Sequence, residues 1–292
     1  MAPEETTRKV IDATESASVT FTDSARTTQR GIIMRVNRYI RQLETDLLGN
    51  IKPTRANFKI IRLLRDDINQ IVVSRAYLER LGSYLRTFSE VKGITDGFFS
   101  SFDDFIPNKL VFEEALSLSV DSTRKSLTSS GINQFVVDPI MDIVSKSITS
   151  GARLVDMEED LRIHILGDEK RLGGLERYTS QITRDALNQY SASYNEAISM
   201  DLGLEWYFYS GGVIDDTRDY CKKRNGKYFH KKEVEDVPSQ WDGRIAGTNS
   251  STIYVYRGGY NCRHQYLATL IDVVPSSVIK RNISNGNYKP ES

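Results

Sequence analysis

Two cysteines and a histidine in the last third of the chain are the residues best suited to chemistry. Cys221 belongs to a polar segment that we expect to form a short helix over 216–223, whereas Cys262 and His264 are separated by a single residue. If residues 261–265 are extended, alternate side chains point the same way, so Cys262 and His264 share one face. A short helix can bring Cys221 toward that face. The spacing therefore predicts a cluster of two thiols and an imidazole.

The chemistry of this cluster has three interpretations. Buried reduced cysteines usually behave as small apolar side chains, so the first is a packed cysteine pair beside a hydrogen-bonded histidine. Thiolates and imidazoles bind zinc, so the second is a zinc site formed by Cys221, Cys262 and His264, with His230 as a further candidate ligand. The third is a catalytic site in which His264 transfers protons beside Asp216 or Cys221. We predict a protein that is not an enzyme and has no cofactor apart from this candidate zinc.

Motifs of the common nucleotide-binding and hydrolytic enzymes are absent from the sequence. It contains no P-loop, no dinucleotide fingerprint, no serine nucleophile elbow and no His-Glu-x-x-His pair. Six basic residues between Lys222 and Lys232 could contact DNA phosphates. Acidic residues follow them at once, so a solvated surface is the alternative. We expect His164 to be a surface or packing histidine.

Length and composition predict a globular protein of two domains. The chain has 292 residues, of which 39% are hydrophobic and 27% charged, and domains average about 150 residues. No apolar run approaches the ~18 residues that span a bilayer, and the first residues lack the apolar core of a signal peptide. Two cysteines are too few for a disulfide scaffold and are typical of a reducing compartment. We therefore expect a cytoplasmic site of synthesis and no membrane partner.

The net charge of zero conceals an uneven distribution. Residues 26–86 contain 13 basic and five acidic side chains, whereas residues 87–210 contain 11 basic and 20 acidic ones. Such asymmetry favours oriented contacts with other charged surfaces, although solvated helix faces would produce the same pattern.

The first third of the chain predicts a flexible arm followed by a helical hairpin. Residues 1–23 are rich in Thr, Ser and Glu and show little periodicity, so we expect a flexible or partner-ordered arm. Apolar residues then recur every three or four positions over 24–48 and again over 54–88, as in amphipathic helices. A short link between two such helices predicts an antiparallel hairpin packed stripe to stripe. The predicted stripe residues are Ile33, Val36, Ile40, Leu43 and Leu47, then Ile61, Leu64, Ile68, Ile71, Leu78, Leu81 and Leu85.

Further helices are expected up to residue 202. Residues 92–107 form a Gly- and Asp-containing segment with four phenylalanines, which we expect to be a loop whose rings plug the protein's own core or a neighbouring subunit. Capping residues and glycines predict helices over 108–128, 138–151, 156–167 and 174–202.

The pattern changes after Gly203. Aromatic and β-branched runs predict strands over 204–209, 253–256 and 264–270. Asp216 is a candidate N-cap for the helix over 216–223, and Asn225-Gly226 is typical of a tight turn with positive φ at both positions. The fold class is therefore α+β, with helices in the first two-thirds and a short antiparallel sheet near the C-terminus. The expected parts are an arm (1–23), a helical assembly region (24–172), an α+β domain (173–281) and a loose tail (282–292).

The order of motifs in residues 180–270 resembles the phage Mu F-like minor head protein, or head morphogenesis, domain. This family has a long helix, an aromatic strand, an Asp-x-Arg segment ending in cysteine, an Asn/Asp-Gly-Lys-x-Phe turn and a final Asn-Cys-Arg segment. The matching stretches here are Thr183-Arg184-Asp185, Gly203 to Tyr207, Asp216 to Cys221, Asn225 to Phe229 and Gly258 to His264. The chain departs from the family by keeping one cysteine in the Asp-x-Arg segment and by ending the last segment in His264. The matching motif residues are Asp216, Arg218, Cys221, Gly226, Lys227, Cys262, Arg263 and His264.

The resemblance implies a structural role in a virus particle. A minor head protein of this family would lie inside the phage head near the portal, after assembly in the host cytoplasm, and would bind portal, scaffold or major capsid subunits. Contact of the basic helices with packaged DNA is a further expectation. The family also implies an alternative, a virion-packaged effector or nuclease-like enzyme delivered with the DNA.

Overall fold

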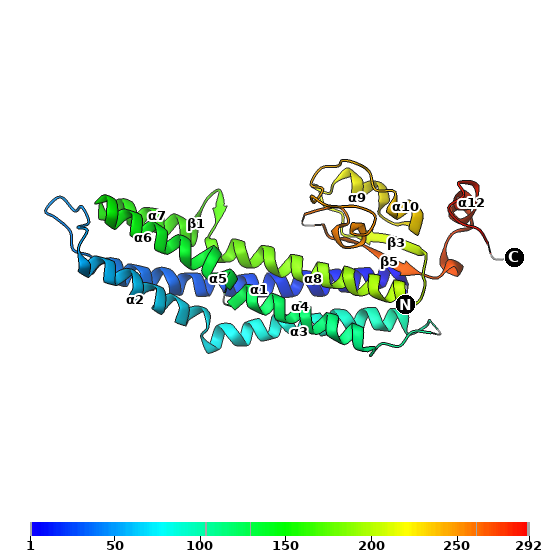
Figure 1. Ribbon diagram of the computed structural model, residues 1–292, viewed down its shortest axis with the longest axis horizontal. Helices are drawn as coiled ribbons and strands as arrows, with labels where there is room; N and C mark the ends of the chain where they lie inside the picture. The colour runs from blue at the N-terminus through cyan, green and yellow to red at the C-terminus, as the bar shows by residue number, and fades with distance from the viewer. Residues whose placement is uncertain (1, 103, 129, 261, 291–292) are drawn as a thin grey trace. The chain divides into compact units, whose positions relative to one another are not determined.

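The computed structural model describes residues 2–102, 104–128, 130–260 and 262–290 (Figure 1). Its elements confirm an α+β fold in which helices dominate the first two-thirds and a small antiparallel sheet lies near the C-terminus. The helical part contains α1 (Pro3–Ile40), α2 (Arg55–Val72), α3 (Arg75–Phe99), α4 (Leu110–Thr128), α5 (Ser130–Ile132), the π-helix η1 (Asn133–Val137), α6 (Asp138–Ser150), α7 (Leu154–Leu166) and α8 (Gly174–Asp201). The strands and short helices are β1 (Gly167–Asp168), β2 (Arg171–Leu172), β3 (Trp206–Gly211), α9 (Asp219–Arg224), β4 (Lys227–His230), α10 (Lys231–Glu235), α11 (Ile253–Tyr256), β5 (His264–Thr269), η2 (Ile271–Val273) and α12 (Ser276–Ser284).

The chain forms two compact units that do not follow chain order. The sheet unit consists of the described parts of residues 1–16, 87–119 and 184–292, and the helical unit of those of 17–86 and 120–183. Helices α1, α3, α4 and α8 each contribute residues to both units. The predicted domains 24–172 and 173–281 therefore do not coincide with the compact units, because a division by residue number cannot separate units that share long helices. No helix of the described residues is long and apolar enough to cross a membrane.

The predicted flexible arm is wrong, because residues 3–23 belong to α1. Their buried side chains recur every three or four residues, as a packed helix requires. Most of them are small hydroxyl residues, so a search for apolar periodicity finds no helix before residue 24. The buried positions of this half of α1 are Pro3, Thr6, Thr7, Val10, Thr14, Ser18 and Phe21.

In the helical unit, aliphatic side chains of α1, α2, α6 and α7 share one core. The predicted stripe residues Val36, Ile40, Leu64 and Ile68 are all fully buried there. Thr54 begins α2 by accepting a hydrogen bond from the backbone N–H of Asn57. The second predicted helix is interrupted near Val73, so α2 and α3 replace a single helix over 54–88. Two predicted stripe residues are exposed instead, Leu47 and Leu78.

The phenylalanine segment packs in the protein's own core. Helix α3 continues to Phe99, so the predicted loop from residue 92 begins later. Phe98 and Phe99 are buried, and the ring centroids of Phe99 and Phe102 lie 5.0 Å apart. Lys92 is buried and pairs with Asp96 at 2.7 Å. This ion pair compensates for the burial of the Lys92 ammonium group within α3.

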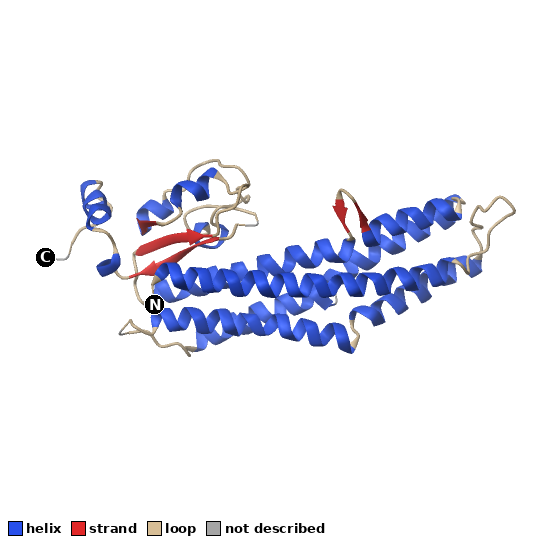
Figure 2. Ribbon diagram, turned by 180° about the vertical axis from the view of Figure 1, so that it is seen from behind, coloured by secondary structure: helices blue, strands red, loops and turns tan. Residues whose placement is uncertain are grey.

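The three-stranded sheet has the order β4-β3-β5, with both neighbours antiparallel to β3. Figure 2 shows the strands in red among the helices. Trp206 at the start of β3 pairs with His230, and Gly211 at its end pairs with His264. The side chain of Asn195 on α8 covers the free edge of β5: it donates to the carbonyl of Tyr266 and accepts from the N–H of Ala268. A helix therefore closes one edge of the sheet.

Two C-terminal predictions are wrong. The predicted strand over 253–256 is the short helix α11. The Asn249 side chain accepts backbone hydrogen bonds from Ser251 and Thr252 just before it, which turns the chain into a helical start. The predicted loose tail also begins too early: Asn282 is fully buried in α12 and donates a hydrogen bond to Glu233 at 2.9 Å.

Candidate metal centre

The fold brings Cys221, Cys262 and His264 together in the sheet unit. Their side chains are all buried, and their candidate ligand atoms lie within 4.8 Å of one another. The two Sγ atoms are 3.7 Å apart, and both cysteines are free. Cys221 comes from α9, and His264 is the first residue of β5. We refer to these three residues as the cysteine–histidine cluster. Asn261, which belongs to the same sequence motif, lies outside the described residues.

Strand β3 supplies the floor of the cluster. Tyr209 is completely buried, and its hydroxyl lies 3.2 Å from the Sγ of Cys221 and 3.8 Å from that of Cys262. Its ring stacks on His264 with 5.4 Å between centroids and 12° between planes. The aromatic strand that the sequence predicted thus orients both the thiols and the imidazole.

A glycine makes room for the two sulfur atoms. A Cβ atom on Gly258 would lie 2.2 Å from the Sγ of Cys221 and 2.9 Å from that of Cys262. Real Cβ atoms essentially never approach so closely, so any side chain at position 258 would displace the cluster. The preceding residue, Arg257, has a positive φ of 49° and is buried. The turn before Cys262 therefore has an unusual backbone shape at the place where it passes the sulfurs.

The start of α9 differs from its prediction. Asp216 is exposed, and the N-cap position belongs to Arg218, which makes no side-chain cap hydrogen bond. In the part of the chain that the structure describes, the buried Nε of Arg218 has no hydrogen-bond partner. Its guanidinium instead lies against Gly243. The prediction of Asp216 as the N-cap is therefore wrong, because the first helical residue of α9 is Asp219.

The Asn225-Gly226 turn joins α9 to the sheet. Gly226 has a φ of 73°, but Asn225 has a φ of −55°, so positive φ occurs at only one of the two predicted positions. The Asn225 side chain accepts a hydrogen bond from the N–H of Gly211, and the N–H of Gly226 donates to the carbonyl of Tyr209. These bonds fix the end of α9, and with it Cys221, to β3. Lys227 follows as an exposed residue of β4.

His230 does not belong to the cluster. It pairs with Trp206, five residues along β3 from the Gly211–His264 pair, which corresponds to about 17 Å at the usual rise of a strand. Its Nδ1 accepts a hydrogen bond from the N–H of Lys232 and so caps α10. The prediction of His230 as a further ligand is therefore wrong, since strand register separates the two histidines.

His164 and the basic residues near Cys221 are not members of the cysteine–histidine cluster. His164 belongs to α7 in the helical unit and is half-buried, and burial lowers its pKa. Lys222 and Lys223 are exposed. The guanidinium of Arg224 lies 3.9 Å from the ring centroid of Tyr220, a cation–π contact that uses one charge of the run locally.

The two thiols have opposite pKa shifts. A hydrogen bond from Cys221 lowers the pKa of Cys262, and the nearby His264 and Arg257 lower it further. The same hydrogen bond, together with burial, raises the pKa of Cys221. This hydrogen bond therefore favours the ionised form of Cys262 and the protonated form of Cys221. A thiolate, the form that binds metals, is favoured at Cys262.

The cluster fits Zn²⁺ in three respects. Zn–S bonds of about 2.3 Å in a tetrahedral site place two sulfurs about 3.8 Å apart, and the observed separation is 3.7 Å. The buried Nε2 of His264 has no hydrogen-bond partner among the described residues. Two thiols and an imidazole are also a donor set that zinc prefers. Zinc held by Cys221, Cys262 and His264 would cross-link α9 to the start of β5, with one coordination position left for water or another ligand.

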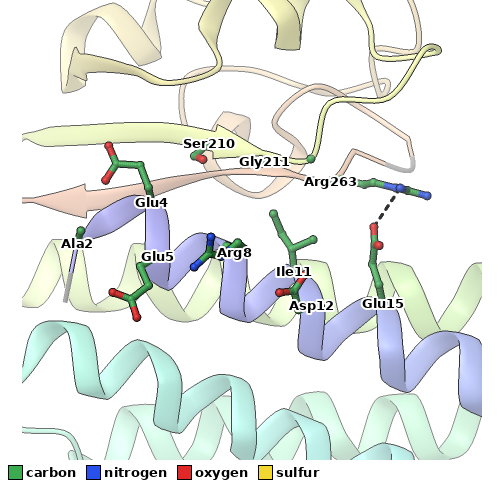
Figure 3. A pocket seen from close by; sticks show the side chains of 11 residues that line it. Ala2, Glu4, Glu5, Arg8, Ile11, Asp12, Glu15, Ser210, Gly211 and Arg263 are labelled. Carbon is green, nitrogen blue, oxygen red and sulfur yellow. Dashed lines mark ion pairs between the residues drawn. The ribbon is translucent and has the colours of Figure 1, made fainter.

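Two hollows near the cluster share part of their lining. A pocket of about 50 Å³ is lined by the cluster, Asp216 and Arg218, among others. A cleft of about 640 Å³ shares Gly212 and Arg263 with it and runs along the first turns of α1 (Figure 3). The side chain of Arg263 points across to Glu15, with 3.1 Å between Nη1 and Oε1. The small pocket has room for an ion or a water molecule.

Sequence reasoning missed this cleft. Its α1 side is formed by charged residues that include Glu4, Arg8, Asp12 and Glu15. Their recurrence every three or four residues is a helical signal that a search restricted to apolar side chains does not detect. The pairing of Arg263 with Glu15 was accordingly not foreseen.

Comparisons with known proteins return no match: no family model, no curated protein and no solved structure is similar to this chain. The likeness to the Mu F-like domain therefore rests on the ordered motifs of residues 180–270.

Proposed function

We propose that this protein is a bacteriophage minor head protein that acts in head morphogenesis near the portal. The observation that carries the proposal is the convergence of the motif residues. Cys221 lies 41 residues before Cys262 in sequence, yet the two thiols and His264 meet beside β3, the aromatic strand that comes before all three in the motif order. Gly226 occupies the turn that fixes α9 to that strand. Short motifs that occur in the family's order and also meet at one centre in the fold favour a common origin with that family over a chance similarity.

The working mechanism is docking. The cysteine–histidine cluster holds the sheet unit in one conformation, while the helical unit exposes charged and apolar side chains for neighbouring subunits. The partners would be portal, scaffold or major capsid subunits, and the basic side chains of residues 26–86 suit an acidic protein surface or the phosphates of packaged DNA. The protein would assemble in the host cytoplasm and reside inside the virion.

A second candidate is a virion-packaged effector or nuclease-like enzyme that is delivered with the DNA. The unpartnered Nε2 of His264 beside a pocket favours it, because a zinc ion there would keep one position free for another ligand. The two candidates differ in the stage at which the protein is needed. A morphogenesis protein is needed for normal particles, whereas a delivered enzyme is needed after DNA entry.

The test is to produce the chain together with the portal, scaffold and major capsid proteins of the same genome and to purify the procapsids. We expect a few copies per particle by quantitative mass spectrometry. Procapsids assembled without the portal serve as the control and should contain fewer copies. A chain that is absent from portal-containing particles would contradict the proposal. Normal particles that lack the protein but fail after DNA injection would favour the delivered enzyme.

A further inference from the structure

The two cysteine side chains of the sheet unit touch each other. The Sγ atoms of Cys221 and Cys262 lie 3.7 Å apart, so no other atom fits between them. Both residues are buried, with relative exposures of 2% and 4%. The sequence contains no third cysteine. Each thiol therefore has the other as its sole thiol partner within the chain, and burial keeps both away from the thiols of a second copy.

Backbone hydrogen bonds hold both cysteines where they meet. The N–H of Cys221 donates to the carbonyl of Arg218 at the start of α9, with 2.9 Å between nitrogen and oxygen. The N–H of Cys262 donates to the carbonyl of Gly259 at 3.2 Å. The hydroxyl of Tyr209 on β3 lies beside both sulfurs. The short separation of the sulfurs is therefore a property of the fold and not a chance encounter of two loose segments.

The geometry is close to that needed for a bond between the sulfurs. An S–S bond is about 2.05 Å long, so the sulfurs must approach by roughly 1.7 Å, which small rotations of both side chains can provide. Reacting atoms in a favourable arrangement lie about 3–3.5 Å apart, only slightly closer than these sulfurs. Gly258 has no side chain to occupy the space beside them. Bond formation therefore needs side-chain rotation and no rearrangement of the backbone.

The pocket beside the cluster limits the size of an oxidant. Its volume is about 50 Å³, and both cysteines are part of its lining. A water molecule needs roughly 10–15 Å³ of such space, whereas pockets for drug-sized molecules have roughly 300–1,000 Å³. Hydrogen peroxide is only slightly larger than water. The pocket therefore admits a small peroxide and excludes a bulky disulfide such as glutathione disulfide.

We infer that Cys221 and Cys262 are a reversible redox pair that hydrogen peroxide oxidises to a disulfide. One sulfur attacks a peroxide oxygen, the O–O bond breaks, and the sulfur becomes a sulfenic acid. The proton of that thiol leaves with the departing hydroxide as water. The second sulfur then attacks the sulfenic sulfur, and the displaced hydroxyl takes the second thiol proton as another water. The two thiols lose two electrons and two protons, and one peroxide is reduced to two waters.

The disulfide would change what the cluster can do. It would join α9 covalently to the segment just before β5. It would also use both sulfurs that zinc requires, so oxidation and zinc binding exclude each other. In a reducing compartment the pair stays as thiols and remains available to a metal. The inference goes beyond the proposed function, because this chemistry does not depend on entry into a particle.

The main experiment treats the purified full-length chain with hydrogen peroxide after reduction and removal of metal by a chelator. N-acetylcysteine in the same tube reports that the peroxide is active. Peptide mass spectrometry, which separates cysteine from methionine oxidation, should find the Cys221 and Cys262 peptides joined with a mass loss of about 2 Da that dithiothreitol reverses. We expect about ten or more such chains for every chain with a sulfinic or sulfonic acid. Mainly over-oxidised chains, disulfides between chains, or thiols that stay free after N-acetylcysteine has reacted would each overturn the inference.

Two single variants serve as matched controls. Cys221→Ser and Cys262→Ser each keep one thiol, so peroxide should give a sulfenic acid that dimedone traps, with no loss of two hydrogens. Wild-type chain should give little dimedone adduct, because the second sulfur removes the sulfenic acid. Equal dimedone labelling of the wild type and both variants would overturn the pairing. Oxidation by glutathione disulfide as fast as by peroxide would overturn access through the small pocket. None of these readouts involves procapsids, so the proposed function is tested separately.

Discussion

The helical unit and the cysteine–histidine cluster are stabilised in different ways. The centre of the helical unit consists of aliphatic side chains such as Val36, Leu64 and Ile68, whose burial is favourable in almost any arrangement of similar volume. The cluster consists of thiols, an imidazole and a tyrosine hydroxyl, whose burial is favourable only when their partners are in place. The stability of the helical unit should therefore respond to changes in side-chain volume. The stability of the cluster should respond to changes in its geometry, its protonation state and its bound metal.

The largest effect should follow from a cavity in the helical unit. Ile68 is completely buried, so Ile68→Ala should lower the free energy of unfolding by about 2–5 kcal/mol and Ile68→Val by about 0.5–1.5 kcal/mol. Urea denaturation measures both. Equal losses for the two variants would show that volume does not govern this core.

Zinc should act on the cluster and not on the helical core. If Cys221, Cys262 and His264 bind zinc, free zinc at one hundred times its Kd should add about 2.7 kcal/mol to the free energy of unfolding. His264→Ala should remove most of this gain, whereas His230→Ala, about 17 Å away along the strand, should retain it. Calorimetry and metal analysis of the purified protein measure the effect. If the purified protein contains no zinc and added zinc does not shift its Tm, the cluster is better interpreted as a packed cysteine pair beside a histidine.

Gly258 tests the geometry of the cluster without changing any of its polar groups. Gly258→Ala places a methyl group against both sulfurs and should cost about 1–3 kcal/mol by overpacking. Gly212→Ala is the matched control, because a Cβ there meets no atom within 4 Å. Equal Tm values for the two variants would mean that the sulfurs move aside easily.

Protonation should distinguish the sheet unit from the aliphatic core. Burial raises the pKa of Glu196 to about 7, and its buried Oε2 has no hydrogen-bond partner among the described residues. Because the folded-state pKa is raised, the neutral form favours folding, and this contribution is lost as the pH rises from about 4.5 through 7. Glu196→Gln should therefore stabilise the protein at pH 8 by about 1–2 kcal/mol, a value reduced for partial exposure, and should have no effect near pH 4. Denaturation at both pH values measures it, and an equal effect at both would contradict the assignment.

The smallest effect is expected for the basic surface of α2. Arg62→Glu should change the free energy of unfolding by less than about 0.5 kcal/mol, because Arg62 is exposed. Arg65→Glu should cost about 0.2–1 kcal/mol, because Arg65 is paired with Asp138 at the surface. Thermal unfolding at low and high salt compares them: the cost for Arg65 should shrink at high salt. A large loss for Arg62 would place it in the core and not on a docking surface.

The sequence by itself determined the elements whose apolar or aromatic residues recur at the spacing of a helix or a strand. The aliphatic stripes of α1 and α2, the long helix α8 and the aromatic strand β3 follow from local spacing, and so does the shared face of Cys262 and His264. The first turns of α1 were missed because most of the side chains on its buried face are threonine and serine. Helix α11 was missed because its residues are strand-like, and the Asn249 side chain turns the backbone just before it by accepting from the N–H of Thr252.

Only the tertiary structure decided which distant residues meet. The register of β3 against β4 and β5 brought His264 to the cysteines and left His230 at the other end of the sheet, since register depends on contacts between segments and not on local spacing. The same holds for the loop between α1 and α2. Leu43 and Leu47 look equivalent in the helical period, but α1 ends at Ile40, and hydrogen bonds to Ala152 and Leu154 then hold the loop where Leu47 faces solvent.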